Sequence, residues 1–125
     1  MKPSRTKRGF RIKRIYEPAV EDDGFRVLID RLWPRGLAKE KAHIDLWLKE
    51  IAPSDSLRRL VHKDPTKWDA FVAAYARELA QEPAKTAAAT LRERVRAEPV
   101  TLLYAARNET RNNAVALKNW LQRSR

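Results

Sequence analysis

The sequence lacks cysteine altogether, so disulfides, thiolate metal sites and cysteine nucleophiles are excluded. It has only three glycines, Gly9, Gly24 and Gly36, which excludes the Walker phosphate loop and the dinucleotide-binding fingerprint in their standard forms. Only His43 and His62 could supply imidazole ligands, and no close ligand spacing surrounds them, so we expect no metal and no cofactor. Long apolar runs are also missing, as is the apolar stretch of a secretory signal. We therefore expect a soluble, cytoplasmic protein without a membrane partner.

Basic residues dominate what is present. Lys and Arg number 27 against 16 Asp and Glu, which gives a formal net charge of +11 in a chain of 125 residues. Such a balance favours phosphate-bearing or other anionic partners, nucleic acid among them. Residues 1–14 carry seven basic side chains and no acid, so the remainder is only mildly basic. Residues 1–9 have no apolar periodicity, and we expect a flexible basic arm there, followed by a single α/β domain over residues 10–125.

Four segments have the pattern of strands. Residues 10–16 alternate apolar and basic side chains, and residues 44–51 alternate as well, although a helix is an open alternative there. Residues 26–32 and 100–106 contain short continuous apolar runs, which are typical of strands covered on both faces. The run Val27-Leu28-Ile29 makes residues 26–32 the best candidate for a central strand.

Helices are predicted between and after these strands. Capping signals and apolar stripes indicate them over residues 56–61, from Asp64-Pro65 to Leu79, over residues 84–97 and over residues 109–122, the last capped by Asn108. Strands and helices therefore alternate along the chain. This order predicts an α/β fold, a small three-layer sandwich whose mainly parallel sheet of about 3 to 5 strands is flanked by helices.

Polar side chains follow both buried strands at their carboxyl ends, where open parallel sheets bind ligands. Arginine guanidinium groups are suited to carboxylate or phosphate, and Trp33 could provide a stacking face. Asp30 adjoins the apolar run of the central strand and is the candidate general base. The predicted ligand-binding residues are Arg31, Trp33, Arg35, Lys49, Ser54, Arg58, Tyr104, Arg107 and Asn108.

Purely structural roles explain the same residues. A buried carboxylate needs a partner, so we expect Asp30 to contact an arginine, namely Arg35, Arg58 or Arg107. Trp33 could equally pack into the core. The charges at the strand ends would then only hold loops in place.

Several segments together resemble a known family. They are residues 16–18, 24–36, 47–54 and 100–108, of which the Trp-Pro-Arg-Gly segment 33–36 and the Ala-Pro-Ser segment 52–54 are the most specific. The chain resembles the YeaO-like branch of the domain-of-unknown-function 488 family. The resemblance implies a compact α/β domain from bacteria or archaea and assigns no reaction. Broader members of that family often carry a Cys at the last strand and a later Cys-His-Arg, where this chain has Tyr104 and Asn112-Asn113, so thiol or metal chemistry does not transfer.

Two functional hypotheses remain open from the sequence. In the first, the strand ends form an arginine-rich anion-binding pocket, catalytic or not, for a nucleotide, a nucleic acid or a phosphorylated metabolite. In the second, the protein is a non-catalytic module that binds nucleic acid or a protein through its basic arm and surface. The oligomeric state is not predicted.

Overall fold

The computed structural model describes residues 8–123. The strands are β1 (Phe10–Arg14), β2 (Phe25–Leu28), β3 (Leu46–Trp47) and β4 (Val100–Tyr104). The helices are α1 (Lys39–Ala42), α2 (Asp55–Lys63), α3 (Trp68–Leu79), α4 (Ala84–Val95) and α5 (Asn113–Arg123), with short 3-10 helices η1 (Glu21–Asp23), η2 (Lys49–Ile51) and η3 (Pro65–Lys67) between them. The predicted arm lies outside the described residues, apart from Arg8 and Gly9.

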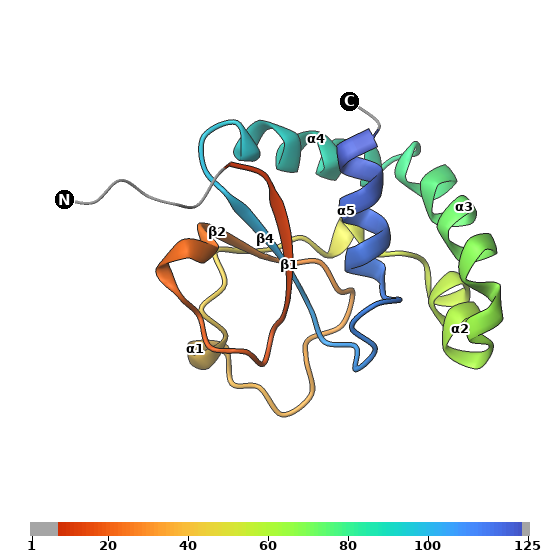
Figure 1. Cartoon of the computed structure of the whole chain (residues 1–125), viewed down its shortest axis with the longest axis horizontal. Coiled ribbons are helices and arrows are strands. Elements are labelled where there is room, and N and C mark those ends of the chain that lie inside the picture. The colour runs from red at the N-terminus through yellow and green to blue at the C-terminus, as the bar shows by residue number, and fades with distance from the viewer. Residues whose placement is uncertain (1–7, 124–125) are drawn as a thin grey trace.

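The four strands form one parallel sheet in the order β1-β4-β2-β3, which confirms the α/β class (Figure 1). β4 enters last and pairs on both sides, so that Val100 lies opposite Phe10 on one neighbour and Phe25 on the other. Parallel inner strands are covered on both faces, which explains their continuous apolar runs. The carboxyl ends of β1, β2 and β4 consequently meet at one edge of the sheet.

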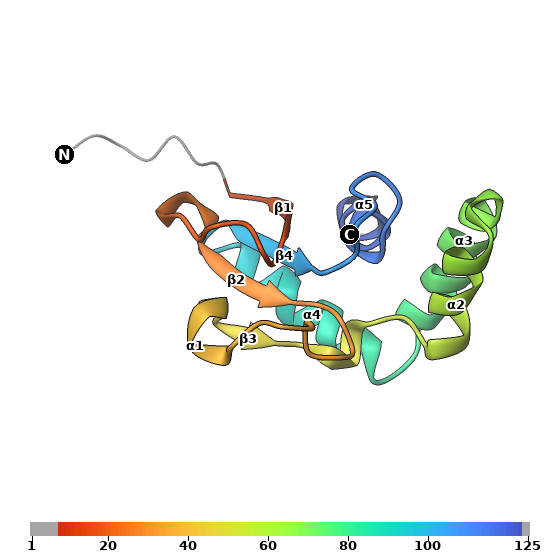
Figure 2. The same ribbon diagram turned by 90° about the horizontal axis from the view of Figure 1, so that it is seen from below.

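Successive side chains of the inner strands face opposite layers. Val27 and Leu102 pack in the main core, which includes side chains of α3, α4 and α5. Leu28 and Leu103 point to the other face and pack in a smaller cluster around Ala42 of α1. Both layers are seen in Figure 2, where α1 lies at β3 and α5 on the opposite side of β4. The second layer is thin, because α1 has four residues and loops complete it.

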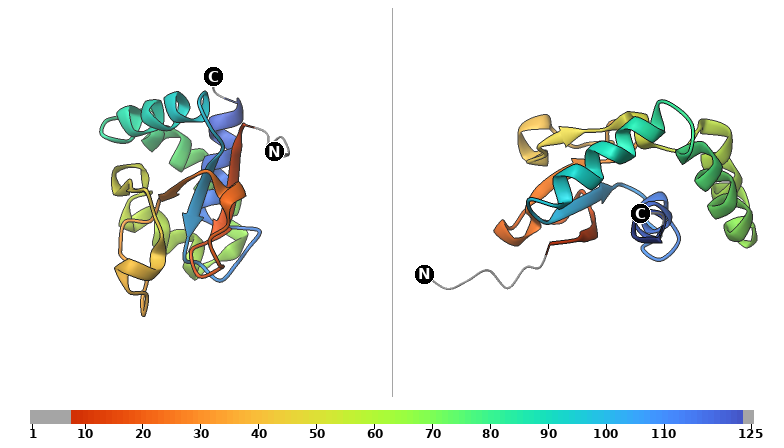
Figure 3. Two further views of the ribbon diagram at one scale, coloured as in Figure 1. Left: turned by 90° about the vertical axis from the view of Figure 1, so that its left-hand side faces the viewer. Right: turned by 90° about the horizontal axis from the view of Figure 1, so that it is seen from above.

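The helices between β3 and β4 extend the molecule sideways. α4 packs against β4, and α3 packs against α2, α4 and α5. In the right-hand view of Figure 3, α4 lies across the strands and the pair α2–α3 lies beyond it. α3 buries Phe71, Tyr75 and Leu79 on one stripe, as its periodicity predicted, and the Tyr75 hydroxyl donates to the Ile51 carbonyl at 2.6 Å.

The structure corrects several predicted boundaries. The strand predicted over residues 44–51 is reduced to β3, because the chain turns into η2 once Leu48 N–H has bonded to the Leu28 carbonyl. The last helix begins at Asn113, since residues 108–111 are held in a turn by the Asn108 side chain. The four-residue α1 was not predicted. Its short length leaves no apolar periodicity to detect.

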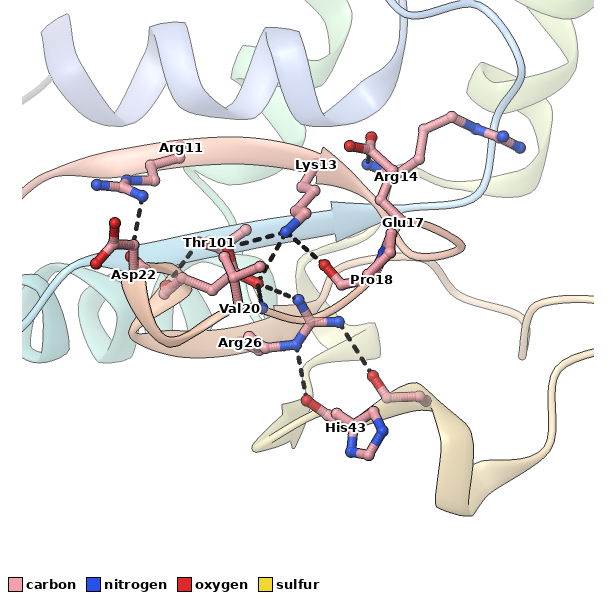
Figure 4. Close-up of polar contacts among 12 residues, drawn as sticks. Arg11, Lys13, Arg14, Glu17, Pro18, Val20, Asp22, Arg26, His43 and Thr101 are labelled. Carbon is pink, nitrogen blue, oxygen red and sulfur yellow. Dashed lines mark hydrogen bonds and ion pairs between the residues drawn. The ribbon is translucent and has the colours of Figure 1, made fainter. Parts of the chain in front are cut away.

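A buried ionic network ties β1, η1 and β2 together (Figure 4). The carboxylate of Asp23 accepts from Lys13 at 3.1 Å and from Arg26 at 2.5 Å. Arg26 also donates to the carbonyls of Ala42 and His43 at the end of α1. Burial acts to raise the pKa of Asp23, but its hydrogen bonds from Val20, Lys13 and Arg26 outweigh burial and hold that pKa below its ordinary value.

Among residues 8–123, no helix is both long and apolar enough to cross a bilayer.

Candidate functional site: an arginine-lined cleft

A cleft of about 990 Å³ opens at the edge where β1, β2 and β4 end. Its walls come from the segments after these three strands and from the region of α2 and α3. The lining residues are Arg14, Tyr16, Asp30, Arg31, Leu32, Trp33, Pro34, Arg35, Ala52, Pro53, Arg58, Val61, Phe71, Ala105, Ala106, Arg107, Asn108, Arg111, Asn112 and Asn113. The cleft thus lies at the sheet edge that the sequence indicated, since parallel strands bring their carboxyl ends together.

Positive charge dominates this cleft. Six arginines line it, and among the described lining residues Asp30 is the only acid. The six are Arg14, Arg31, Arg35, Arg58, Arg107 and Arg111. Positive groups gathered in a concave surface reinforce one another's potential and attract anions.

Asp30 is held by two neutral donors. The backbone N–H of Ala105 donates to its Oδ2 and the side-chain amide of Asn113 donates to its Oδ1, both at 2.9 Å. The predicted direct contact with Arg35, Arg58 or Arg107 was therefore wrong: Arg58 acts on Asp30 only through its charge, while the amides hold the carboxylate. Burial raises the pKa of Asp30 above its ordinary value, and the two hydrogen bonds and Arg58 oppose that rise.

Two of the arginines fasten the cleft walls. Arg14 donates through Nε to the Ala106 carbonyl and through Nη2 to the Ala105 carbonyl, both at 2.9 Å. Arg31 donates through Nη2 to the Ala52 carbonyl at 3.1 Å. Guanidinium groups bound to carbonyls keep their charge, so these residues contribute to the potential of the cleft while they fix its loops.

Arg35 and Arg107 are differently placed. Both are exposed, and within residues 8–123 their guanidinium groups have no hydrogen-bond or ion-pair partner. Arg58 makes only a solvent-exposed pair with Asp55, at 3.5 Å. Such a pair is weak, so the guanidinium groups of Arg35, Arg58 and Arg107 are not fastened to the cleft walls as those of Arg14 and Arg31 are.

Three of the predicted ligand-binding residues lie outside the cleft lining. Lys49 places its ammonium 4.9 Å from the ring centroid of Trp47. Ser54 caps α2 and donates to the carboxylate of Glu78 at 2.6 Å. Tyr104 is 2% exposed, because its position in β4 points it into the main core. The predicted residues that do line the cleft are Asp30, Arg31, Trp33, Arg35, Arg58, Arg107 and Asn108.

Trp33 is partly buried in the smaller apolar cluster. Its ring makes an edge contact with Trp47, with centroids 5.4 Å apart and planes at 68°. Its indole N–H donates to the Leu37 carbonyl at 2.6 Å, within a turn whose Gly36 has φ 75°. The rigid loop predicted from Pro34 and Gly36 therefore holds Trp33 largely against protein.

Asn108 was predicted to cap the last helix, and this prediction was wrong. Asn108 instead accepts from the N–H groups of Thr110 and Arg111 at 3.0 and 2.9 Å. The cap is Asn112, whose Oδ1 accepts from the Val115 N–H at 3.0 Å. Both residues are asparagines that make local turns, so the sequence favoured the one nearer the strand.

The sequence interpretation missed several lining residues. They are Arg14, Tyr16, Asn112 and Asn113. Arg14 and Tyr16 follow β1, and applying the rule of carboxyl ends to that strand as well would have found them. Asn112 and Asn113 carry no such signal in the sequence. Whether they line the cleft depends on the residue at which α5 begins, and the sequence did not predict that residue correctly.

No metal centre accompanies the cleft in the part of the chain that the structure describes: residues 8–123 contain no group of three or more His, Cys, Asp or Glu side chains placed to hold an ion.

Comparison with known proteins gives a consistent family and no function. A family model described as "Inactive DUF488-N3 subclade" matches residues 9–125. The chain is 43% identical over 110 residues to "Uncharacterized protein YeaO" of Escherichia coli K12, which covers 88% of this chain and 94% of that protein. It is 38% identical over 111 residues to "Uncharacterized protein Rv3073c" of Mycobacterium tuberculosis H37Rv, covering 89% and 92% of the two chains. No solved structure matches the chain significantly.

Proposed function

Because the chain belongs to the DUF488-N3i subclade, whose model is described as inactive, we propose that its arginine-lined cleft binds a phosphate-bearing ligand without transforming it. The observation that carries this proposal is the charge imbalance of the cleft, six arginines against Asp30. If these arginines served only to hold the loops in place, we would expect acidic side chains beside them as ion-pair partners. Arg35 and Arg107 instead extend into solvent.

Arginine matches phosphate better than other cations do. Its planar group offers two parallel donors to two oxygens, and its charge persists at every physiological pH. Hydrogen bonds to the main chain also favour an anion. Arg14 and Arg31 donate to carbonyl oxygens in the cleft walls, and these oxygens would otherwise repel a phosphate. The accessible arginines can then contact the phosphate directly.

We propose no turnover because Asp30, the candidate general base, is engaged in contacts within the protein. Both of its oxygens accept hydrogen bonds, from Ala105 and Asn113, so the carboxylate joins the loop after β2 to the start of α5. Each oxygen keeps a further lone pair, but the two contacts fix the direction in which the carboxylate points. We therefore assign Asp30 a positioning role, in which it holds the loop after β2 against Ala105 and the start of α5.

Calorimetric titration with inorganic pyrophosphate tests the proposal. Arg35→Gln and Arg107→Gln should each weaken binding at least about tenfold, because each removes a charge-assisted hydrogen bond. Arg77→Gln is the matched control, since Arg77 is exposed on α3 and lies outside the cleft lining, and it should leave the affinity unchanged. Equal affinity of wild type and both cleft variants would overturn the proposal.

A second experiment separates the cleft from the basic arm. Deleting residues 2–7 retains Gly9, whose carbonyl accepts from the Val100 N–H at 3.0 Å, so β4 keeps this contact. The proposal expects pyrophosphate affinity to survive this deletion. Loss of affinity in the deletion variant, with Arg35→Gln and Arg107→Gln unaffected, would favour the arm as the binding element.

A further inference from the structure

We infer that the ligand of the cleft carries a nucleobase as well as phosphate, and that Tyr16 provides the face on which the base stacks. This inference rests on the proposed function and extends it to the ligand class. Its starting point is the distribution of exposed apolar side chains. Among the described residues the large exposed hydrophobics are Tyr16 at 43%, Val20 at 53% and Leu32 at 65%, and two of the three line the cleft.

Tyr16 is exposed yet fixed in position. Its hydroxyl donates to the Arg35 carbonyl at 2.9 Å, which joins the segment after β1 to the loop after β2, and both segments line the cleft. The guanidinium carbon of Arg14 lies 5.0 Å from its ring centroid. Arg14 is itself anchored on the carbonyls of Ala105 and Ala106. The ring is thus held from two sides, so stacking a ligand on it costs little additional side-chain entropy.

An exposed aromatic ring among arginines matches the chemistry of nucleotides. Bases stack on aromatic side chains whatever their identity, because every base has a π-face, and arginines take up the adjoining phosphates. The guanidinium of Arg14 lies over one face of the Tyr16 ring, which leaves the other face for a base. The hydroxyl of Tyr16 is bonded to the Arg35 carbonyl, so the exposed side chain of Arg35 begins beside the ring and can take up a phosphate. A phosphate alone would not use the apolar surface that the Tyr16 ring and Leu32 expose.

Trp33 is less suited to this stacking. Its ring packs against Trp47 and its N–H is bonded to Leu37. The size of the cleft agrees with a larger ligand, since about 990 Å³ lies near the upper end of the range for pockets that hold drug-sized molecules. Six arginines likewise exceed the need of a single phosphate group.

Two sources supply this chemistry, a free nucleotide and a segment of single-stranded nucleic acid, and paired probes distinguish them. The first pair is adenosine 5′-monophosphate with ribose 5-phosphate, which lacks the base. The second is a single-stranded thymidine octamer with an abasic octamer of equal length. Wild-type protein should bind the base-bearing member of one pair about tenfold more tightly. Preference in the first pair identifies a free nucleotide, and preference only in the second identifies a strand.

Variants of Tyr16 test its role. Tyr16→Leu removes the ring but retains apolar volume, and it should abolish the preference for the base-bearing probe while the base-free probe binds as before. Tyr16→Phe keeps the ring and should keep the preference, with circular dichroism confirming that both variants fold. The inference is overturned if neither pair shows a preference, or if the preference persists in Tyr16→Leu. Base-free probes would still bind in that case, whereas failure of all four probes to bind would overturn the proposed function itself.

Discussion

The amide of Asn113 donates to Oδ1 of Asp30, with 2.9 Å between Nδ2 and the oxygen. This contact joins residues 83 positions apart and connects the loop after β2 to the first residue of α5. The second carboxylate oxygen accepts from the Ala105 N–H, at the end of β4. Asp30 therefore gathers three segments that line the cleft.

Replacing Asp30 should cost stability in proportion to the acceptors removed. Asp30→Ala leaves the donors of Ala105 and Asn113 unpaired, and we expect a loss of about 1–3 kcal/mol in urea denaturation. Asp30→Asn should lose less, because its oxygen can accept from Ala105 while a turned Asn113 amide accepts from its NH₂. Asn113→Ala in the Asp30→Ala background should add little. Full additivity of these two changes would contradict a direct contact.

Asp30 should also weaken anion binding. It is the only acid among the lining residues that the structure describes, so Asp30→Asn should strengthen pyrophosphate binding several-fold at neutral pH. Because the pKa of Asp30 is raised, the difference in affinity between wild type and Asp30→Asn should shrink as the pH falls toward that pKa, and this comparison cancels the protonation of pyrophosphate itself. Asp69→Asn on α3, outside the lining, is the control and should change nothing. Weaker binding by Asp30→Asn would instead show that the carboxylate assists the ligand.

Asp23 should make the fold acid-sensitive. Its pKa is lowered in the folded state, so between the folded and unfolded values the unfolded chain binds more protons and stability rises with pH. The contribution is present above about pH 5 and is lost as the pH falls through the folded pKa. Asp23→Ala leaves Arg26 and Lys13 without their acid and should cost about 3–5 kcal/mol at pH 7. In denaturation at pH 3 the difference from wild type should shrink, and a constant difference would contradict this account.

Gly24 should be irreplaceable where Gly36 is not. A Cβ at Gly24 would lie 2.3 Å from the Pro99 carbonyl oxygen, whereas a Cβ at Gly36 meets nothing within 4 Å. Both have positive φ, 64° and 75°. Gly36→Ala should therefore cost only the left-handed strain of about 1–2 kcal/mol, and Gly24→Ala clearly more, since β2 and Pro99 must separate. Thermal melts give the measurement. Equal melting temperatures for Gly24→Ala and Gly36→Ala would contradict the claim that the Pro99 carbonyl leaves no room for a Cβ at Gly24.

The inner strands were predictable because burial on both faces leaves a local mark. Val27-Leu28-Ile29 and Leu102-Leu103 are apolar at every position, which is typical of short strands covered on both faces. The location of the cleft followed from the same strands, since their carboxyl ends adjoin. Boundaries were less predictable where a side chain ends an element through a local turn, as Asn108 does before α5.

The partners of the site residues could not be predicted from the sequence. The sequence offers many arginines as partners for Asp30, but its carboxylate accepts a hydrogen bond from Asn113 instead. Asn113 comes close to Asp30 only because of where α5 begins. Ser54 donates a hydrogen bond to Glu78 on α3, and Tyr104 packs in the main core. Each of these contacts depends on packing between distant elements, which residue types and spacing do not encode.

The most direct test of the central claim is to locate the bound anion in solution. We would titrate inorganic pyrophosphate into isotope-labelled protein and follow the backbone amide resonances by NMR. The account predicts saturable shifts confined to the segments that line the cleft, around residues 30–35 and 105–113, with α4 and the exposed face of α3 unaffected. Shifts that are absent, or that spread over the basic surface without saturating, would contradict an anion site at these strand ends.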